Sequence, residues 1–200
     1  MSRPSTRTPR YCDNPIVSGY PGYLALPDGT RKPCETHFRV WLQISRLFDD
    51  PAVPDLEKAA RAISLSGIEP GDVAEDLDGV SWFLHAGAVE TRPRKAAQRS
   101  MDWDMDAGLI VASFQKEYGI DITARGCSMH WWRFLDLLRG MGNDAPIMQA
   151  AQVRAMKLPE GNDKWSRERR DAIAEAKKRL AIPAKTASEK AAREKALWGD

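Results

Sequence analysis

Two short sequences in this chain place a cysteine three residues before a histidine: Cys34 before His37, and Cys127 before His130. Thiolate sulfur and imidazole nitrogen are the ligands that structural zinc prefers, and two such pairs make a tetrahedral Cys₂His₂ set. Each pair lies at the predicted start of a helix, so a zinc site would need the two helix starts to be neighbours. A wide gap separates the pairs, and neither carries the glycine of a zinc knuckle. We therefore expect no metal, and keep these four residues as the alternative.

Three aspartates, Asp102, Asp104 and Asp106, alternate along the chain just before another predicted helix. Such carboxylates could bind a metal, but acids also gather at helix starts, where they cap free N–H groups and favour the positive end of the helix dipole. We interpret them as helix-start acids. The chain has only three histidines, and it lacks a phosphate-binding loop, a dinucleotide fingerprint, a nucleophile elbow and an HExxH helix. We therefore expect no catalytic residue, no cofactor and no enzyme.

The composition predicts a globular protein. Of the 200 residues, 42% are hydrophobic and 29% are charged, and the net charge is +2. This balance allows a buried core and excludes collagen-like and wholly disordered chains. No run of about 18 apolar residues could cross a membrane, and the basic start is not followed by the apolar stretch of a secretory signal. Three widely spaced cysteines make a poor disulfide framework, which favours an intracellular setting.

The first structured element is expected to be a β-hairpin. Residues 22–27 and residues 30–32 flank Asp28 and Gly29, and an Asp-Gly pair is favoured in a tight hairpin turn. Prolines at both ends keep these strands short and at an edge.

Helical spacing dominates the rest of the chain. Thr36 is expected to cap a helix with Phe38, Trp41 and Phe48 on one face, and Gly119 to end a helix with Ile120 folding back on its last turn. Other helices are predicted around residues 56–63, 73–84, 148–156 and 165–180, with a basic linker over residues 91–95. We expect Ser128 to cap a central helix. The predicted core consists of Phe38, Trp41, Ile110, Phe114, Tyr118, Trp131, Phe134, Leu135 and Leu138.

Two surfaces remain as candidates for binding a partner. Trp132 points about 100° away from Trp131 on a helix, so both rings are not expected to face one core. The basic helix from Trp165 to Leu180 has a narrow apolar line of its own. We predict that Trp132, Trp165 and Leu180 contact a partner or a second copy of the chain, since exposed apolar surface and aromatic side chains are typical of interfaces.

The chain is divided here into a flexible N-terminal extension over residues 1–20, a single mainly helical domain with an N-terminal hairpin over residues 21–183, and a charged tail over residues 184–200 that can form a helix. Residues 164–200 carry 11 Lys and Arg against 6 Asp and Glu. Acids and bases alternate there, which is typical of a solvated helix face. A surface for nucleic acid is the alternative.

Three motifs stand in a distinctive order. Residues 36–43 read THFRVWLQ, residues 102–121 begin DWDMDAGLIVASF and end YGID, and residues 129–138 read MHWWRFLDLL. In order and spacing they resemble TDFRVWL, DFEQDAELIYAAF…YGIDL and LHWWKFRALL of a bacteriophage family named after gene product 15. Arg154 and residues 177–183 are similar to the family's ending, so the resemblance spans residues 26–183. His37 stands where the family has Asp, which removes an acid from the helix start.

The resemblance implies a role in the morphogenesis of long phage tails. Its implied activity is that of a tail-assembly chaperone, its implied partner a tape-measure or other tail protein, and its implied location the cytoplasm of the bacterial host. No catalytic or cofactor residue comes with the resemblance. We expect self-association as a further possibility, and neither a membrane nor a nucleic acid as a partner. The alternatives are a basic helical nucleic-acid-binding protein and a zinc-stabilised adaptor.

Overall fold

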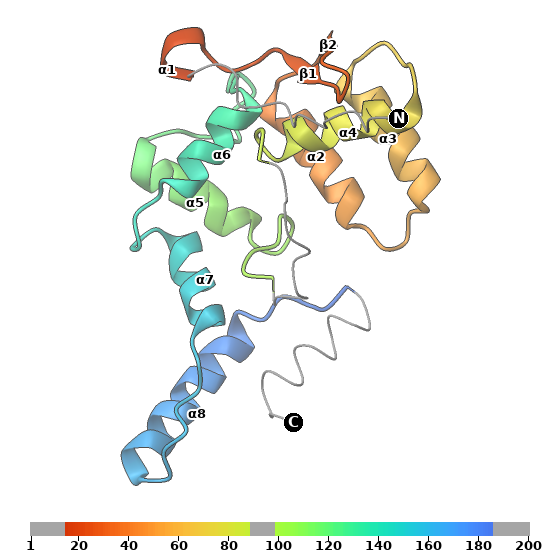
Figure 1. The fold of residues 1–200 in the computed structure, drawn as a ribbon. Helices are drawn as coiled ribbons and strands as arrows, with labels where there is room; N and C mark the ends of the chain where they lie inside the picture. The colour runs from red at the N-terminus through yellow and green to blue at the C-terminus, as the bar shows by residue number, and fades with distance from the viewer. Residues whose placement is uncertain (1–14, 89–98, 186–200) are drawn as a thin grey trace, which may run out of the picture. The chain divides into compact units, whose positions relative to one another are not determined.

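The structure is a computed structural model that describes residues 15–88 and 99–185. These residues form eight helices and one two-stranded sheet, which confirms the predicted mainly helical fold with a small hairpin (Figure 1). The chain divides into two compact units. Unit 1 comprises residues up to Pro93 together with Ser128–Arg139, and unit 2 comprises Arg94–Cys127 and Gly140–Asp200. No helix in the described part of the chain combines the length and the hydropathy needed to span a bilayer.

Several sequence-based expectations concern residues that the structure does not describe. The basic linker over residues 91–95, most of the N-terminal extension and almost all of the tail after residue 184 lie outside the described residues. The proposed division of the chain at residues 20 and 183 therefore stays a prediction. Within the described part of the extension, Pro15–Ser18 form the short helix α1.

The hairpin of unit 1 lies where the sequence predicts it. Strands β1 (Tyr23–Ala25) and β2 (Arg31–Pro33) pair antiparallel. Asp28 fixes the turn, because its carboxylate accepts a hydrogen bond from the backbone N–H of Thr30 at 2.7 Å. The hairpin packs on helix α4 (Val73–Leu84) at Gly79, where an added Cβ would lie 2.7 Å from the Leu26 side chain. A larger residue at this position would have to displace the Leu26 side chain and press on the Cβ of Leu24, which would lie 3.2 Å away.

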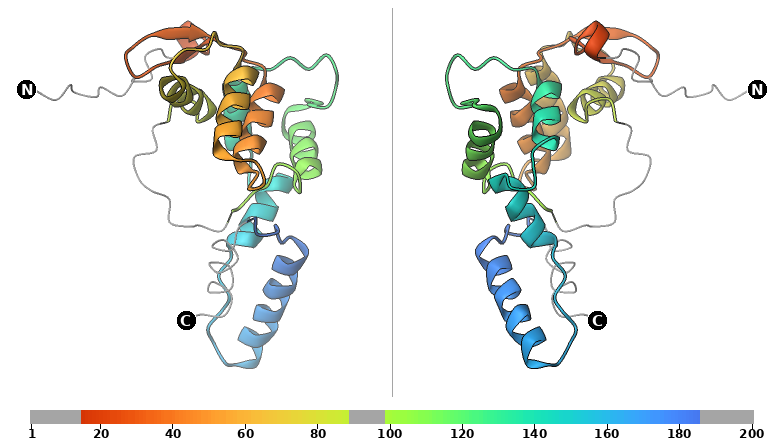
Figure 2. Two further views of the ribbon diagram at one scale, coloured as in Figure 1. Left: turned by 90° about the vertical axis from the view of Figure 1, so that its right-hand side faces the viewer. Right: turned by 90° about the vertical axis from the view of Figure 1, so that its left-hand side faces the viewer.

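Helices α2 (Phe38–Asp49) and α3 (Asp55–Ser66) pack together beside α4 (Figures 1 and 2). The buried residues of α2 are Phe38, Trp41, Ile44 and Leu47. This buried side differs from the predicted one, because Phe48 is 36% exposed. Spacing alone could not distinguish these sides, since Leu47 and Phe48 are adjacent apolar residues on neighbouring faces.

Helix α6 (Trp131–Arg139) completes the core of unit 1, packing against α2. The ring of Phe134 stacks between two others, with centroids 5.1 Å from Phe38 and 5.6 Å from Trp131. The indole N–H of Trp131 donates to the backbone oxygen of Leu84 at 2.9 Å, and that of Trp132 donates to the backbone oxygen of Phe83 at 2.8 Å. These two carbonyls belong to the last turn of α4, where the helix leaves its final oxygens without i+4 donors; the oxygen of Phe83 also accepts from the N–H of Ala86 at 3.1 Å.

Unit 2 contains helices α5 (Ala107–Tyr118), α7 (Pro146–Ala155) and α8 (Lys164–Arg179). Helix α5 packs on α7, and α7 contacts α8. The Ser113 hydroxyl of α5 accepts a hydrogen bond from the backbone N–H of Ile147 at 3.0 Å, which satisfies a free donor at the start of α7. As predicted, Gly119 ends α5 with a positive φ of 66°, and the N–H of Ile120 folds back to the carbonyl of Phe114.

The structure buries nearly all of the predicted core. Tyr118 is the exception, and is half-buried near the end of α5. The buried members are Phe38, Trp41, Ile110, Phe114, Trp131, Phe134, Leu135 and Leu138.

We predict that Phe134→Ala destabilises the fold by about 3–5 kcal/mol, because it removes the ring between Phe38 and Trp131 and leaves a cavity. Urea unfolding measures this loss. Phe48→Ala is the control, since this ring is 36% exposed and its removal should cost much less. Equal losses for the two variants would contradict the assignment of Phe134 to the core.

Candidate functional site

The two C-x-x-H sequences bring two helix starts together. Residues His37 and His130 form an isolated antiparallel bridge, in which the N–H of Phe38 donates to the oxygen of Met129 at 2.9 Å and the N–H of Trp131 donates to the oxygen of Thr36 at 2.8 Å. The two helix starts, whose adjacency a zinc site would have required, are therefore neighbours in unit 1.

Both histidines act as helix caps. Nδ1 of His37 accepts a hydrogen bond from the N–H of Arg39 at 3.2 Å, and Nδ1 of His130 accepts one from the N–H of Trp132 at 3.0 Å. Each ring thus takes the role that Ser, Thr, Asp or Asn usually fills. Thr36 and Ser128 were expected to cap these two helices, and both predictions were wrong. The capping side chains are His37, one residue after Thr36, and His130, two residues after Ser128. The Asp of the resembling family motif was the available signal, because His37 occupies the position of that acid.

Hydrogen bonds and ring stacking fix the position of the His130 side chain. Since Nδ1 accepts a hydrogen bond, the proton of the neutral ring lies on Nε2, which donates to the carbonyl of Pro21 at 3.0 Å. Tyr20 stacks on the ring with a centroid distance of 5.1 Å, and its hydroxyl donates to Asp136 of α6 at 3.0 Å. Burial lowers the pKa of His130, against the opposing effect of the bond to Pro21.

The remaining members of the candidate zinc set do not fit a metal. Burial, with the charge of Glu35, raises the pKa of Cys34 to about 12, which disfavours the thiolate that zinc needs. Cys34 and Cys127 form no disulfide. Within residues 15–88 and 99–185 no three His, Cys, Asp or Glu side chains are grouped so that they could hold a metal.

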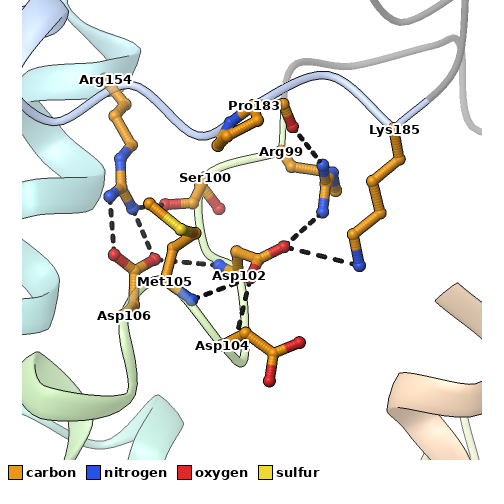
Figure 3. Close-up of polar contacts among 9 residues, drawn as sticks. All are labelled: Arg99, Ser100, Asp102, Asp104, Met105, Asp106, Arg154, Pro183 and Lys185. Carbon is orange, nitrogen blue, oxygen red and sulfur yellow. Dashed lines mark hydrogen bonds and ion pairs between the residues drawn. The ribbon is translucent and has the colours of Figure 1, made fainter. Parts of the chain in front are cut away.

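The alternating aspartates of unit 2 belong to a cluster of ion pairs (Figure 3). The carboxylate of Asp102 accepts hydrogen bonds from the N–H groups of Asp104 and Met105, both at 3.0 Å, and so caps the turn before α5. It also binds Arg99 at 2.6 Å and Lys185 at 3.6 Å. Burial alone would raise the pKa of Asp102, but the two N–H groups and the two cations together hold it below its usual value.

Asp106 pairs with a cation from a different helix. Its two oxygens accept from the guanidinium of Arg154 on α7, both at 2.7 Å, and the two side chains are 2% and 6% exposed. Arg154 further donates to the oxygens of Leu180 at 2.6 Å and Ser100 at 2.9 Å. The guanidinium therefore joins the segment before α5, the helix α7 and the end of α8. This buried pair is a structural clamp, because the carboxylate and most of the guanidinium donors are satisfied within the chain.

The partner surface assigned to Trp132 needs correction. Trp132 is only 2% exposed, and its ring packs against Trp82 and Phe83 with centroid distances of 5.1 and 5.4 Å. Trp131 and Trp132 are both buried, because core elements surround the first turn of α6. The prediction from the sequence had assumed a helix with one buried face.

The other two candidates lie on α8. Trp165 is 70% exposed, and the guanidinium of Arg169 lies 5.8 Å from the centre of its ring. Leu180 is half-buried at the end of the helix, where its carbonyl binds Arg154. No residue of α8 is buried. Of the three predicted partner contacts, Trp165 is thus the one that the structure presents openly.

Comparison with known protein families gives a match. A family model described as Bacteriophage Gp15 protein matches residues 25–182, which include most of the hairpin and every helix from α2 to α8. The match therefore covers well over half of the chain. No curated protein and no solved structure matches it.

We predict that acid weakens unit 1 through His130. Because the pKa of this ring is lowered in the folded chain, its contribution to the free energy of unfolding is complete above about pH 6.5 and is lost as the pH falls below that value. Urea unfolding between about pH 8 and pH 5.5 measures the loss. His130→Asn should reduce this pH dependence, because an amide oxygen can cap the helix without titrating. An unchanged pH dependence in this variant would contradict the assignment.

We further predict that Arg154→Met destabilises the chain by about 3–5 kcal/mol, because it leaves the buried carboxylate of Asp106 without its cation. Thermal and urea unfolding measure this loss. Arg61→Met is the control, since the pair of Arg61 with Glu57 is 56% and 53% exposed and is worth at most about 1 kcal/mol. Similar losses for the two variants would show that the clamp does not stabilise unit 2.

Proposed function

The chain belongs to the Bacteriophage Gp15 protein family, and from this membership we propose that it acts in phage morphogenesis as a tail-assembly chaperone. In this proposal the protein is not an enzyme, and it works by binding a tape-measure protein or another tail component. A tape-measure polypeptide is long and helical, and its apolar surface would aggregate before tail subunits enclose it. A small helical binder could cover that surface until then.

The observation that supports a binding role is the exposure of α8. Trp165 presents an aromatic ring to solvent, and large aromatic side chains commonly supply most of the binding energy at interfaces. A surface helix is also suited to packing along an amphipathic helix of a partner. Trp165 is therefore the residue that we assign to the tail partner.

The charges of α8 favour a protein partner over a nucleic acid. Basic residues are frequent in this helix, but Glu168, Asp171 and Glu175 interrupt them. A phosphate-binding surface needs a continuous basic stripe, since its affinity depends on the number of phosphates neutralised. Basic residues such as Arg167 and Lys178 would instead steer the first encounter with an acidic helical surface. We place this encounter in the cytoplasm of the bacterial host, where tails assemble.

We predict that the tagged protein, co-expressed with the tail genes that neighbour its own, captures a tape-measure or other tail protein. Trp165→Ala should lower the recovered tail protein by about tenfold or more, because it removes the anchoring ring. Leu56→Ala is the matched control, since Leu56 is 81% exposed on a helix of the other unit. Affinity purification followed by mass spectrometry measures the recovery.

Deletion of the gene tests the proposal in the phage. Electron microscopy of lysates should show intact heads and no complete tails, and the wild-type gene supplied in trans should restore the tails. Normal tails from the deletion, with no tail protein recovered by the tagged chain, would contradict the proposal.

A further inference from the structure

We propose that residues 181–185, the segment that follows α8, form a strap whose opening releases α8 from unit 2 as one piece. Figure 3 shows this strap passing beside the turn before α5. Ile182 is its apolar anchor, with only 2% of its surface exposed. Lys185 at its end lies 3.6 Å from a carboxylate oxygen of Asp102. The strap is thus fixed both by burial and by charge.

Two arginines hold the backbone of the strap. The guanidinium of Arg154 donates to the oxygen of Leu180 at 2.6 Å, where α8 ends. The guanidinium of Arg99 donates to the oxygen of Pro183 at 2.9 Å. The two bonds therefore hold one short stretch of backbone at both of its ends, with the buried side chain of Ile182 between them.

These attachments can break without leaving a buried charge alone. Each arginine has a carboxylate partner outside the strap, Asp106 for Arg154 at 2.7 Å and Asp102 for Arg99 at 2.6 Å. A buried ion pair is costly to break because one charge is left without its partner. When the strap opens, both arginines keep their aspartates and lose only hydrogen bonds to backbone oxygens, which water can replace. Opening of the strap therefore costs less free energy than disruption of the turn beneath it.

Helix α8 has a weak hold of its own on unit 2. None of its 16 residues is buried. Its contacts come from half-buried residues such as Ile173, and from Arg170, which donates to the oxygens of Pro159 at 2.9 Å and Gly161 at 2.6 Å. A helix of this length is only marginally stable alone in water. Release of the strap should therefore detach or melt the whole of α8, while α5 stays packed on α7.

Opening makes the covered side of α8 accessible. In the closed chain Ile173 and Leu180 are half-buried and Ile182 is buried. A partner that binds these apolar side chains would therefore select the open form. The inference concerns the purified chain and does not rest on the proposed function, which assigns the tail contact to Trp165, a residue already exposed in the closed form.

Native-state hydrogen exchange, followed by NMR for each backbone N–H, tests the strap. We predict that the N–H groups of α8 share one opening constant that is about tenfold or more larger than the constants of α5 and α7, because only the strap must open. Ile182→Ala should raise exchange about tenfold or more as far back as Arg170, about three turns away. Ala181→Ser is the matched control, since it changes an exposed residue of the same strap, and it should leave these rates unchanged.

A substitution in the core of unit 2 should give the reverse pattern. Ile110 lies on α5 and is 4% exposed. Ile110→Val should raise the exchange rates of α5 and α7 and leave those of α8 unchanged, because it destabilises the closed and the open chain equally.

Three results would overturn the proposal. The first is exchange of α8 in step with α5 and α7 in the wild-type chain. The second is an effect of Ile182→Ala that is confined to the last turn of α8, and the third is an acceleration of α8 by Ile110→Val as large as that of α5. Ile182→Val, a smaller truncation, should act in the same direction as Ile182→Ala and takes its place if the alanine variant does not fold.

Discussion

The core of unit 1 depends on which hydrogen-bond donors reach the last backbone carbonyls of helix α4. The last carbonyls of α4 lie against buried aromatic side chains, where a backbone oxygen without a donor would cost stability. The indole N–H of Trp131 supplies the donor for Leu84, and that of Trp132 adds a second donor for Phe83, whose oxygen also accepts from the N–H of Ala86. Both rings must therefore lie inside, and α6 must enter the core by its first turn. The stacking of Phe134 and the packing of α2 follow from that entry.

The start of α6 is fixed by a second constraint of the same kind. The starts of α6 and α2 lie next to each other. The N–H of Trp131 donates to the oxygen of Thr36, just before α2, and the N–H of Phe38 donates to the oxygen of Met129, just before α6. The two histidine rings accept one further N–H each. In both C-x-x-H sequences the histidine ring, a group that could bind zinc, instead accepts a backbone N–H at a helix start.

Patterns among neighbouring residues predicted more of this structure than did any relation between residues far apart in the sequence. The Asp-Gly turn, the glycine that ends α5 and most of the buried aromatic residues could be inferred from neighbours in the sequence, and the phage family from three motifs. Trp132 could not, because hydrophobic spacing describes a helix with one buried side and α6 has core contacts on several. Arg154 could not be paired with Asp106 either, since 48 residues separate them and nothing local marks an arginine that will be buried.

The path of the chain sets the order in which this protein can fold during synthesis. Unit 1 contains residues up to Pro93 and then Ser128–Arg139, so the ribosome must complete most of the first half of unit 2 before α6 emerges. Until then α4 has neither indole at its end, and Phe38 lacks its stacking partner. A nascent chain that stops before residue 128 therefore lacks α6 and carries an unfinished core with exposed apolar surface, the kind of intermediate that is prone to aggregate.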